Sequence, residues 1–369
     1  MPFRDLAIDA SRAGAAQKTG TEWYSREIIR ALAELRPRPR MTLYLRLGQV
    51  AERGPGLRSR AVRVPRLWTH LGLSAALLRD RQDALFVPAH VLPLYHPRAS
   101  VVTIHDLGYL VEPEAHTRQR RVMLDLTTRW SAHSARRVIA VSEQTKADLV
   151  ARYKVEPGRI DVIHHGLDHE RFRPRPPAEV VPRLAKLGVR QPYVLFLSTL
   201  QPRKNVMRLI EAFEGLGQDD LTLVLAGRSG WLAAEIERRI SESPARARIL
   251  RLGHVPDEAV PALYNGAAVF ALPSLYEGFG MGVLEAMASG CPVLTSDRSS
   301  LPEVAGGAAV LVDPFDSAAI HAGLAEALEP ERRARLVTAG LQHAAAFTWE
   351  RAAAETLATI RHAYRDAHG

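Results

Sequence analysis

The sequence predicts an α/β protein made of two doubly wound domains. Short runs rich in Val, Ile and Leu alternate with longer helical patterns along the whole chain, which is typical of parallel sheets buried on both faces. The chain has 369 residues, too many for one ordinary core and enough for two domains of about 170 residues each. Two such sheets facing one another would form a cleft between the domains, where ligands of this fold class bind.

The apolar runs fall into two series. The first predicts strands at residues 6–9, 42–45, 84–87, 101–104, 138–141 and 161–164, and the second at residues 193–197, 222–226, 248–252, 269–272, 293–295 and 310–312. Between them, residues 171–177 are too rich in proline to continue a helix or a strand. We therefore expect domains at residues 1–175 and 176–345. The amphipathic segment at 346–369 should form a helix that packs back on the first domain.

Composition indicates an ordinary globular protein, with 47% apolar and 24% charged residues. No apolar run approaches the roughly 18 residues needed to span a bilayer. A charge lies near the N-terminus where a signal peptide needs an apolar stretch, so we expect a cytoplasmic location. The single cysteine, Cys291, excludes an internal disulfide and a cysteine-rich metal site.

The net charge of +9 is concentrated in the first half of the chain. Residues 1–175 carry a balance of +12 and the remainder −3, and residues 36–40 alternate Arg and Pro in a basic turn. One interpretation is an anionic partner for the first domain, such as a membrane surface, nucleic acid or a diphosphate. The other is compositional, because only five of the 49 basic residues are Lys. Both interpretations stay open.

A glycine-rich loop follows the predicted strand at 269–272. Residues 275–285 read Leu-Tyr-Glu-Gly-Phe-Gly-Met-Gly-Val-Leu-Glu, and a helix should begin near Met281. Glycines let backbone amides approach a ligand, and the helix N-terminus attracts anions, so the loop suits a diphosphate. Glu277 and Glu285 can accept hydrogen bonds from sugar or ribose hydroxyls. A plain glycine-rich turn is the alternative; a dinucleotide fingerprint is excluded because Val283 replaces its third glycine.

A basic pair follows the first predicted strand of the second domain. Arg203 and Lys204 stand where that strand passes into a helix, and together they can neutralise two phosphates. Asn205 is a favourable N-cap for the helix. A solvated surface pair is the ordinary alternative, but the carboxyl end of a first strand is where α/β domains bind ligands.

Together these segments resemble family 4 of the retaining glycosyltransferases, which have the GT-B fold of two Rossmann-like domains. The Glu-x7-Glu motif matches Glu277 and Glu285, and the basic motif matches residues 202–205. Residues 101–107 (Val-Val-Thr-Ile-His-Asp-Leu), 141–146, 162–168 and 300–306 also look like the family. Departures are a single glycine, Gly20, beside the first helix, and His165 and Gln201 where Asn and Glu are common.

The resemblance implies a role for each matching residue. Arg203 and Lys204 would hold the donor diphosphate and stabilise its leaving charge, and Glu285 would bind the ribose. Glu277 would lie beside the transferred sugar. The remaining donor-binding and catalytic candidates are Gly20, His105, Phe279, Gly280 and Met281. His105 would donate a hydrogen bond near the reacting centre, although a His at a strand end is ordinarily a packing residue.

The resemblance also implies the reaction. We expect retaining, metal-independent transfer of a hexose from a nucleotide diphosphate sugar, with GDP-mannose favoured as co-substrate and no other cofactor. The acceptor would be a glycan or lipid-linked chain in cell-surface polysaccharide synthesis, bound by the first domain. Alternatives are a catalytically silent sugar-nucleotide-binding protein and another GT-B activity, such as an epimerase or a phosphorylase. Nucleic-acid binding is disfavoured, because basic strands rich in aromatic residues are missing.

Two further patterns have competing interpretations. The helical stretch at 117–137 carries Val122, Met123, Leu126 and Trp130 among several arginines. It is either a helix that buries one stripe or a peripheral face for the inner side of an anionic membrane. Clustered histidines at 164, 165 and 169 lack a further metal ligand, and Ser300-x-x-Glu303 has the pattern of a capping box.

Overall fold

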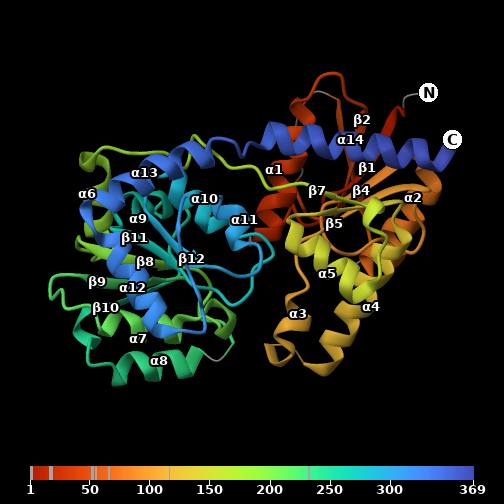
Figure 1. Cartoon of the computed structure of the whole chain (residues 1–369). Helices are drawn as coiled ribbons and strands as arrows, with labels where there is room; N and C mark the ends of the chain where they lie inside the picture. Colours follow the sequence, from red (N-terminus) through yellow and green to blue (C-terminus); the bar gives the residue numbers. More distant parts are fainter. Residues whose placement is uncertain are drawn as a thin grey trace. The chain divides into compact units, whose positions relative to one another are not determined.

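The computed structural model describes residues 3–15, 20–50, 54, 56–64, 67–115, 117–231 and 233–369. The chain forms two compact units, Met1–Gly166 with Thr348–Gly369, and Leu167–Phe347 (Figure 1). Each unit is an α/β domain with one parallel sheet, so the predicted fold class is confirmed. The proline-rich residues 171–177 lie inside the second unit, and residues 348–369 belong to the first.

The first unit has a seven-stranded sheet in the order β3-β2-β1-β4-β5-β6-β7. Its strands are β1 (Asp5–Asp9), β2 (Arg40–Arg46), β3 (Leu57–Val62), β4 (Ala84–Val87), β5 (Ala99–Ile104), β6 (Arg137–Ala140) and β7 (Ile160–Val162). Its helices are α1 (Gly20–Glu34), α2 (Ser74–Asp80), α3 (Gly108–Val111), α4 (Arg118–Ser134), α5 (Glu143–Tyr153) and α14 (Trp349–His368). Single turns lie at Trp68–Leu73, Pro113–Ala115 and Pro157–Arg159.

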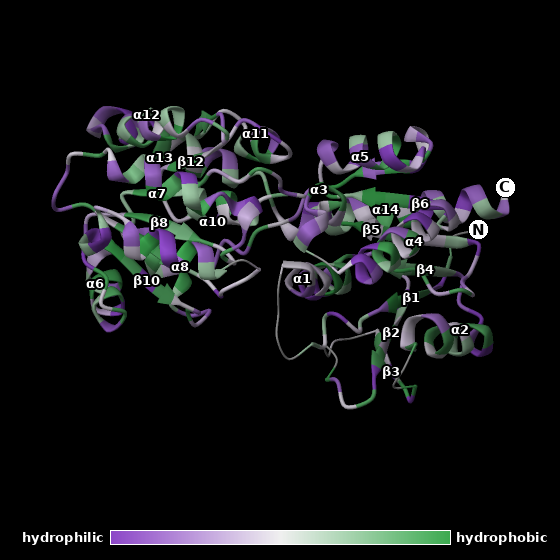
Figure 2. Ribbon diagram, turned by 90° about the horizontal axis from the view of Figure 1, so that it is seen from below, coloured by the Kyte–Doolittle hydropathy of each residue, from purple (hydrophilic) through white to green (hydrophobic). Residues whose placement is uncertain are grey.

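Side chains of the first sheet alternate between two cores, as the two-residue period of a strand requires. Leu6 and Ile8 pack under α1 and α14, whereas Ala7 belongs to the core on the other face. α14 contributes Leu357 and Ile360 to the first of these cores. Figure 2 shows the strands mainly in hydrophobic colours and the helices in both colours. The last helix is therefore part of the first unit's core.

The second unit has a six-stranded sheet in the order β10-β9-β8-β11-β12-β13. Its strands are β8 (Tyr193–Leu197), β9 (Thr222–Ala226), β10 (Ile249–Gly253), β11 (Val269–Leu272), β12 (Val293–Ser296) and β13 (Val310–Val312). Its helices are α6 (Pro177–Lys186), α7 (Val206–Glu214), α8 (Ala233–Glu242), α9 (Val260–Gly266), α10 (Met281–Ala288), α11 (Leu301–Ala305), α12 (Ser317–Leu328) and α13 (Pro330–Ala344). Single turns lie at Pro202–Lys204 and Arg246–Arg248.

Strand order in both units reverses beside the first strand, at β1/β4 and at β8/β11. Ligands of open α/β sheets bind at the carboxyl ends of the strands on either side of such a point. In the second unit those strands end at Leu197 and Leu272, directly before the basic pair and the glycine-rich loop. The fold therefore brings the two sequence-predicted donor segments to one edge of one sheet.

Every predicted strand overlaps a strand of the structure, but β3 was missed. Its sequence, Leu-Arg-Ser-Arg-Ala-Val, lacks an apolar run because β3 is an edge strand with largely exposed side chains.

The boundary between the units requires a glycine. A Cβ at Gly166 would lie 2.3 Å from the backbone nitrogen of Trp349, so only glycine allows the chain to pass the start of α14.

Candidate functional site

The loops after β8 and β11 are joined by hydrogen bonds. The backbone oxygen of Arg203 accepts from the nitrogen of Leu275 at 2.8 Å, and Arg203 Nη1 donates to the backbone oxygen of Tyr276 at 2.9 Å. Asn205 Nδ2 donates to the oxygens of Pro273 (2.9 Å) and Pro314 (2.6 Å). The basic pair and the glycine-rich loop, separated by about 70 residues in sequence, thus form one structure.

Arg203, Lys204 and Glu277 form a three-charge cluster at this junction. Arg203 Nη1 lies 3.0 Å from Glu277 Oε2, and Lys204 Nζ pairs with Glu277 Oε1. Ser274 Oγ donates to the same Oε1 at 2.8 Å. Lys204 is 7% exposed and Glu277 6%, so both charges are buried. Buried charges need partners of this kind, and the cluster keeps a net charge of +1.

Burial and the two cations act in opposite directions on Glu277. Burial alone would raise the pKa of Glu277, but Lys204, then Arg203, together with the hydrogen bonds from Lys204 and Ser274, lower this pKa to about 2. Glu277 is therefore a carboxylate at neutral pH. It holds both cations in fixed positions rather than acting as an acid.

The glycine-rich loop is fixed by two serines from the segment before α11. Ser299 Oγ donates to the backbone oxygen of Glu277 at 2.6 Å, and Ser300 Oγ donates to the oxygens of Glu277 (3.0 Å) and Phe279 (2.8 Å). Ser300 is the N-cap residue of α11 but makes no side-chain capping bond. The serine bond of the predicted capping box is therefore wrong, because this hydroxyl is used to order the loop.

α10 begins where the sequence places it, at Met281 after Gly280. Gly280 has a φ of +110°, and a Cβ there would lie 2.8 Å from Leu301, so the turn into the helix requires glycine. Phe279 is buried and meets Phe347 edge to face at 6.3 Å. The N-terminal amides of α10 thus follow a rigid turn, which suits them to an anion.

Glu285 lies on α10, one side of which is covered by α9. Tyr264 Oη donates to Glu285 Oε2 at 3.0 Å. Burial raises the pKa of Glu285, against the lowering effects of the Tyr264 hydrogen bond and of Arg171. The tyrosine thus orients one carboxylate oxygen.

His105 follows β5 in the first unit and is buried. Its Nε2 donates to the oxygen of Pro88 at 2.8 Å, and its ring lies 5.3 Å from that of His90. Burial, then the charge of His90, lowers the pKa of His105 to about 4, against raising effects from Pro88 and Asp106. The neutral ring therefore presents Nδ1 as an acceptor; donation to a sugar, as the resemblance implies, would require Nε2 to leave Pro88.

Gly20 and two of the clustered histidines, His165 and His169, have ordinary structural positions. Gly20 is the exposed first residue of α1, and residues 16–19 before it lie outside the described residues. A Cβ at Gly20 would meet nothing within 4 Å, so packing does not require glycine there. His165 packs against Tyr24 at 4.7 Å in the first unit, whereas His169 Nε2 bonds the oxygen of Phe347 at 3.0 Å in the second.

A polar cavity of 350 Å³ lies at the carboxyl ends of β1 and β4 in the first unit. Arg12 Nη1 lies 3.0 Å from Glu22 Oε1 on its wall. Asp9 is also on the wall, and burial raises its pKa against the lowering effect of hydrogen bonds from Ser11. The cavity offers carboxylates and a guanidinium, which are suitable partners for sugar hydroxyls.

α4 does not bury its apolar stripe. Val122, Met123, Leu126 and Trp130 are 47%, 64%, 60% and 42% exposed, and the buried residues of the helix lie near its C-terminus. The buried-stripe interpretation is therefore wrong. Across the described ranges, no helix is both long and apolar enough to cross a membrane.

Sequence reasoning missed several residues that hold the site in place. They are Asn205 as a tie between loops, Tyr264, Ser274, Ser299 and Ser300. Of these, the sequence singled out only Asn205 and Ser300, and it predicted both as helix caps. The position of Asn205 as N-cap residue of α7 is confirmed, but its side chain makes no capping bond.

Comparison with known proteins agrees with this architecture. The two parallel-sheet units define the GT-B fold class, and solved structures of that class cover nearly the whole chain. Sucrose-phosphate synthase from Thermosynechococcus elongatus superposes with a TM-score of 0.79 at 21% identity, covering 98% of this chain and 100% of its own. HepE of Anabaena, in complex with UDP-glucose, gives 0.73 at 19% identity, covering 96% and 99%.

Two family models match the chain, glycosyl transferases group 1 over residues 184–343 and glycosyltransferase family 4 over residues 19–171. The O-antigen chain mannosyltransferase B of Escherichia coli is 34% identical over 294 residues, 78% of this chain and 77% of the relative. The chain belongs to family 4 of the glycosyltransferases, as the sequence predicted, and is a transferase of this family.

We predict that Glu277→Gln makes the free energy of unfolding depend less on pH in the acid range. A carboxylate with a lowered pKa stabilises the fold fully above its unfolded pKa and loses that contribution as the pH falls toward about 2. Between about pH 5 and about pH 3 the wild type should therefore lose about 2 kcal/mol more unfolding free energy than the variant.

Urea unfolding at the two pH values measures this difference. Glu235→Gln, at an exposed position on α8, is the matched control and should follow the wild type. Parallel losses in the wild type and Glu277→Gln would contradict the ion-pair assignment.

Proposed function

We propose that this glycosyltransferase moves a hexose, with retention of configuration and without a divalent cation, from a nucleotide diphosphate sugar to a glycan or lipid-linked acceptor. Mannose from GDP-mannose is the favoured donor, and cell-surface polysaccharide synthesis is the favoured setting. The observation that carries the proposal is the Arg203–Glu277–Lys204 cluster at the carboxyl ends of β8 and β11.

The charge of the leaving group supports metal-independent transfer. Cleavage of a glycosyl phosphate builds negative charge on the diphosphate, which many transferases stabilise with a metal ion. Here a guanidinium, an ammonium and the N-terminus of α10 approach the same loop. Protein hydrogen bonds and ion pairs fix their positions, so little reorganisation is needed as the charge grows.

The hydrogen bonds of Glu277 support attack from the same face over a covalent intermediate. Lys204 and Ser274 occupy Oε1, and Arg203 occupies Oε2. A carboxylate with both oxygens engaged by cations is a weak nucleophile. We therefore assign Glu277 to holding the cations and reading sugar hydroxyls, and Glu285 to the ribose.

The remaining donor and acceptor assignments rest on different observations. The Escherichia coli relative is named a mannosyltransferase, which favours mannose. The backbone amides of Phe279, Gly280 and Met281 lie on the fixed turn and would contact the donor. For Gly20, the family resemblance alone suggests donor binding. The polar cavity at the carboxyl ends of β1 and β4 would take the acceptor. His90 lines this cavity, and the ring of His105 packs against His90.

We also propose a cytoplasmic enzyme in peripheral contact with the inner face of an anionic membrane. The exposed apolar residues of α4 are flanked by exposed Arg118, Arg120 and Arg129 on the same helix. Apolar side chains insert at the headgroup boundary while each arginine near an anionic leaflet contributes about 1 kcal/mol.

Replacing Arg203 and Lys204 by Ala should lower kcat by about two to three orders of magnitude, because stabilisation of the leaving diphosphate is lost. Transfer from GDP-mannose to an extract containing lipid-linked acceptors measures the effect. Arg183→Ala with Lys186→Ala, an exposed Arg and Lys on α6, is the matched control.

The wild type should retain its rate of transfer in excess chelator. Strict dependence of this rate on Mg²⁺ or Mn²⁺ would contradict the metal-free mechanism.

Met123→Ser with Leu126→Ser should weaken binding to anionic vesicles about tenfold or more, because the inserted apolar surface is removed. Co-sedimentation measures the affinity, and both residues are exposed, so stability should not change. Leu78→Ser with Leu94→Ser, at 54% and 57% exposure in the same unit, is the control. Equal vesicle binding by the two double variants would exclude α4 as the contact.

A further inference from the structure

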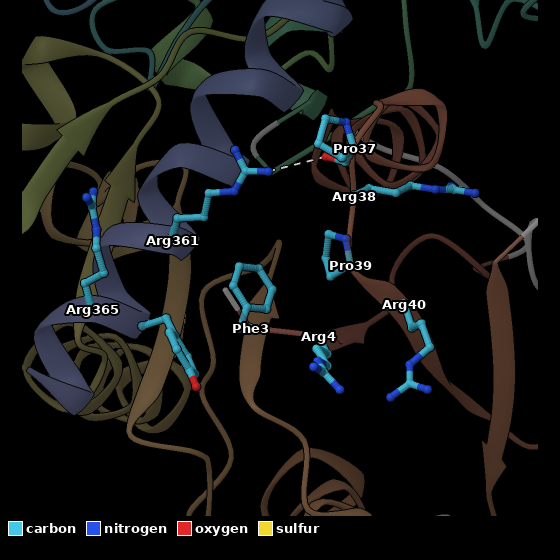
Figure 3. Close-up of a pocket in the computed structure, with 9 residues that line it drawn as sticks. Phe3, Arg4, Pro37, Arg38, Pro39, Arg40, Arg361 and Arg365 are labelled. Carbon is cyan, nitrogen blue, oxygen red and sulfur yellow. Dashed lines mark hydrogen bonds between the residues drawn. The ribbon is translucent and has the colours of Figure 1, made fainter. Parts of the chain in front are cut away.

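A second cavity, of 930 Å³, lies in the first unit at the amino ends of β1 and β2 (Figure 3). Arg4 directly precedes β1, and Arg40 is the first residue of β2. Arg361 and Arg365, near the C-terminus of α14, form the facing wall. This edge of the sheet is opposite to the carboxyl ends that carry Asp9 and His105, so the cavity is separate from the acceptor site proposed above.

The lining of this cavity is strongly basic. Its charged members are Arg4, Arg38, Arg40, Arg361 and Arg365, and none of the nine lining residues that the structure describes is acidic. The alternation of Arg and Pro at 36–40 places two of these arginines on one wall, with Pro37 before Arg38 and Pro39 between the two. A cavity lined by charges of one sign raises the local concentration of counter-ions.

Three of the five guanidiniums already have protein partners. Arg40 makes a bidentate pair with Asp5 at 2.8 and 2.6 Å, Arg361 Nη2 donates to the oxygen of Pro37 at 3.3 Å, and Arg38 donates to the oxygen of Ala33. Within the described ranges, the guanidiniums of Arg4 and Arg365 form no hydrogen bond or ion pair. They come from opposite walls, and each adds a positive charge to the cavity that no described protein group neutralises.

The remaining lining residues are apolar or aromatic. Phe3 is 7% exposed and its ring lies 5.7 Å from that of Tyr364, which also lines the cavity together with the two prolines. Figure 3 shows Phe3 between Arg4 and the two arginines of α14. A ligand that fits this surface has an apolar body as well as a phosphate, and the volume is within the range of small-ligand sites, about 300–1,000 Å³.

We propose that this cavity binds a phosphate group carried on an apolar body, with Arg4 and Arg365 supplying positive charge from opposite walls. The phosphate has two sources, a phospholipid in a bilayer or a soluble organic phosphate. The site does not depend on the donor chemistry of the second unit, so it can be tested separately from transfer.

The test compares Arg4→Gln/Arg365→Gln with Arg58→Gln/Arg79→Gln. Both double variants remove two positive charges from exposed arginines of the first unit whose side chains make no hydrogen bond with another described residue. Isothermal titration uses octyl phosphate below its micelle concentration, with neutral octyl glucoside for comparison. Co-sedimentation uses phosphatidylglycerol vesicles, with phosphatidylcholine vesicles for comparison. Unchanged melting temperatures and sugar transfer verify that each variant is folded.

The wild type and the control variant should bind octyl phosphate in preference to octyl glucoside, and Arg4→Gln/Arg365→Gln should bind it about tenfold or more weakly. An equal loss in phosphatidylglycerol co-sedimentation for that variant alone identifies the bilayer as the source; unchanged co-sedimentation identifies a soluble phosphate. No preference for octyl phosphate in the wild type, or the same loss in both double variants, would overturn the proposal.

Discussion

The pairing of two cations with one buried carboxylate is the constraint on which the site depends. Lys204 and Glu277 are both buried, and each needs oppositely charged or hydrogen-bonding partners to remain charged, because burial of an isolated charge costs far more than a domain's net stability. Their pairing fixes the loop after β8 against the loop after β11. It also leaves an excess of one positive charge beside the N-terminus of α10, so the electrostatic attraction for a diphosphate is built into the fold.

The surrounding structure serves to keep this cluster rigid. Strand order places both loops at the switch point of the second sheet, and Asn205, Ser299 and Ser300 tie them to neighbouring segments. The first unit uses the same strand order and is completed by α14, which returns from the end of the chain. Each unit thus presents polar groups at the carboxyl ends of its own strands. The basic cavity lies at the opposite, amino ends of the strands of the first unit.

Sequence patterns predicted the fold well because buried parallel strands are continuous apolar runs, as in Tyr193–Leu197. β3 escaped because an exposed edge strand has no such run. The charged members of the site were recognised from motifs, but their supports were not. Tyr264 reaches Glu285 from 21 residues away and Ser300 reaches Phe279 from another loop, and no local pattern encodes contacts of that kind. The exposure of the apolar stripe on α4 could not be predicted from the sequence either, because helical periodicity is the same for a buried and an exposed face.

The most direct test of the central claim compares the affinity of nucleoside diphosphates and monophosphates for the wild-type protein by isothermal titration. If the cluster and the N-terminus of α10 hold the pyrophosphate, GDP should bind at least about tenfold more tightly than GMP, or UDP than UMP, with the difference decreasing as salt increases. Equal affinities within both pairs would contradict the account, because the base and ribose would then supply the binding energy and the three-charge cluster would have no part in recognising the donor.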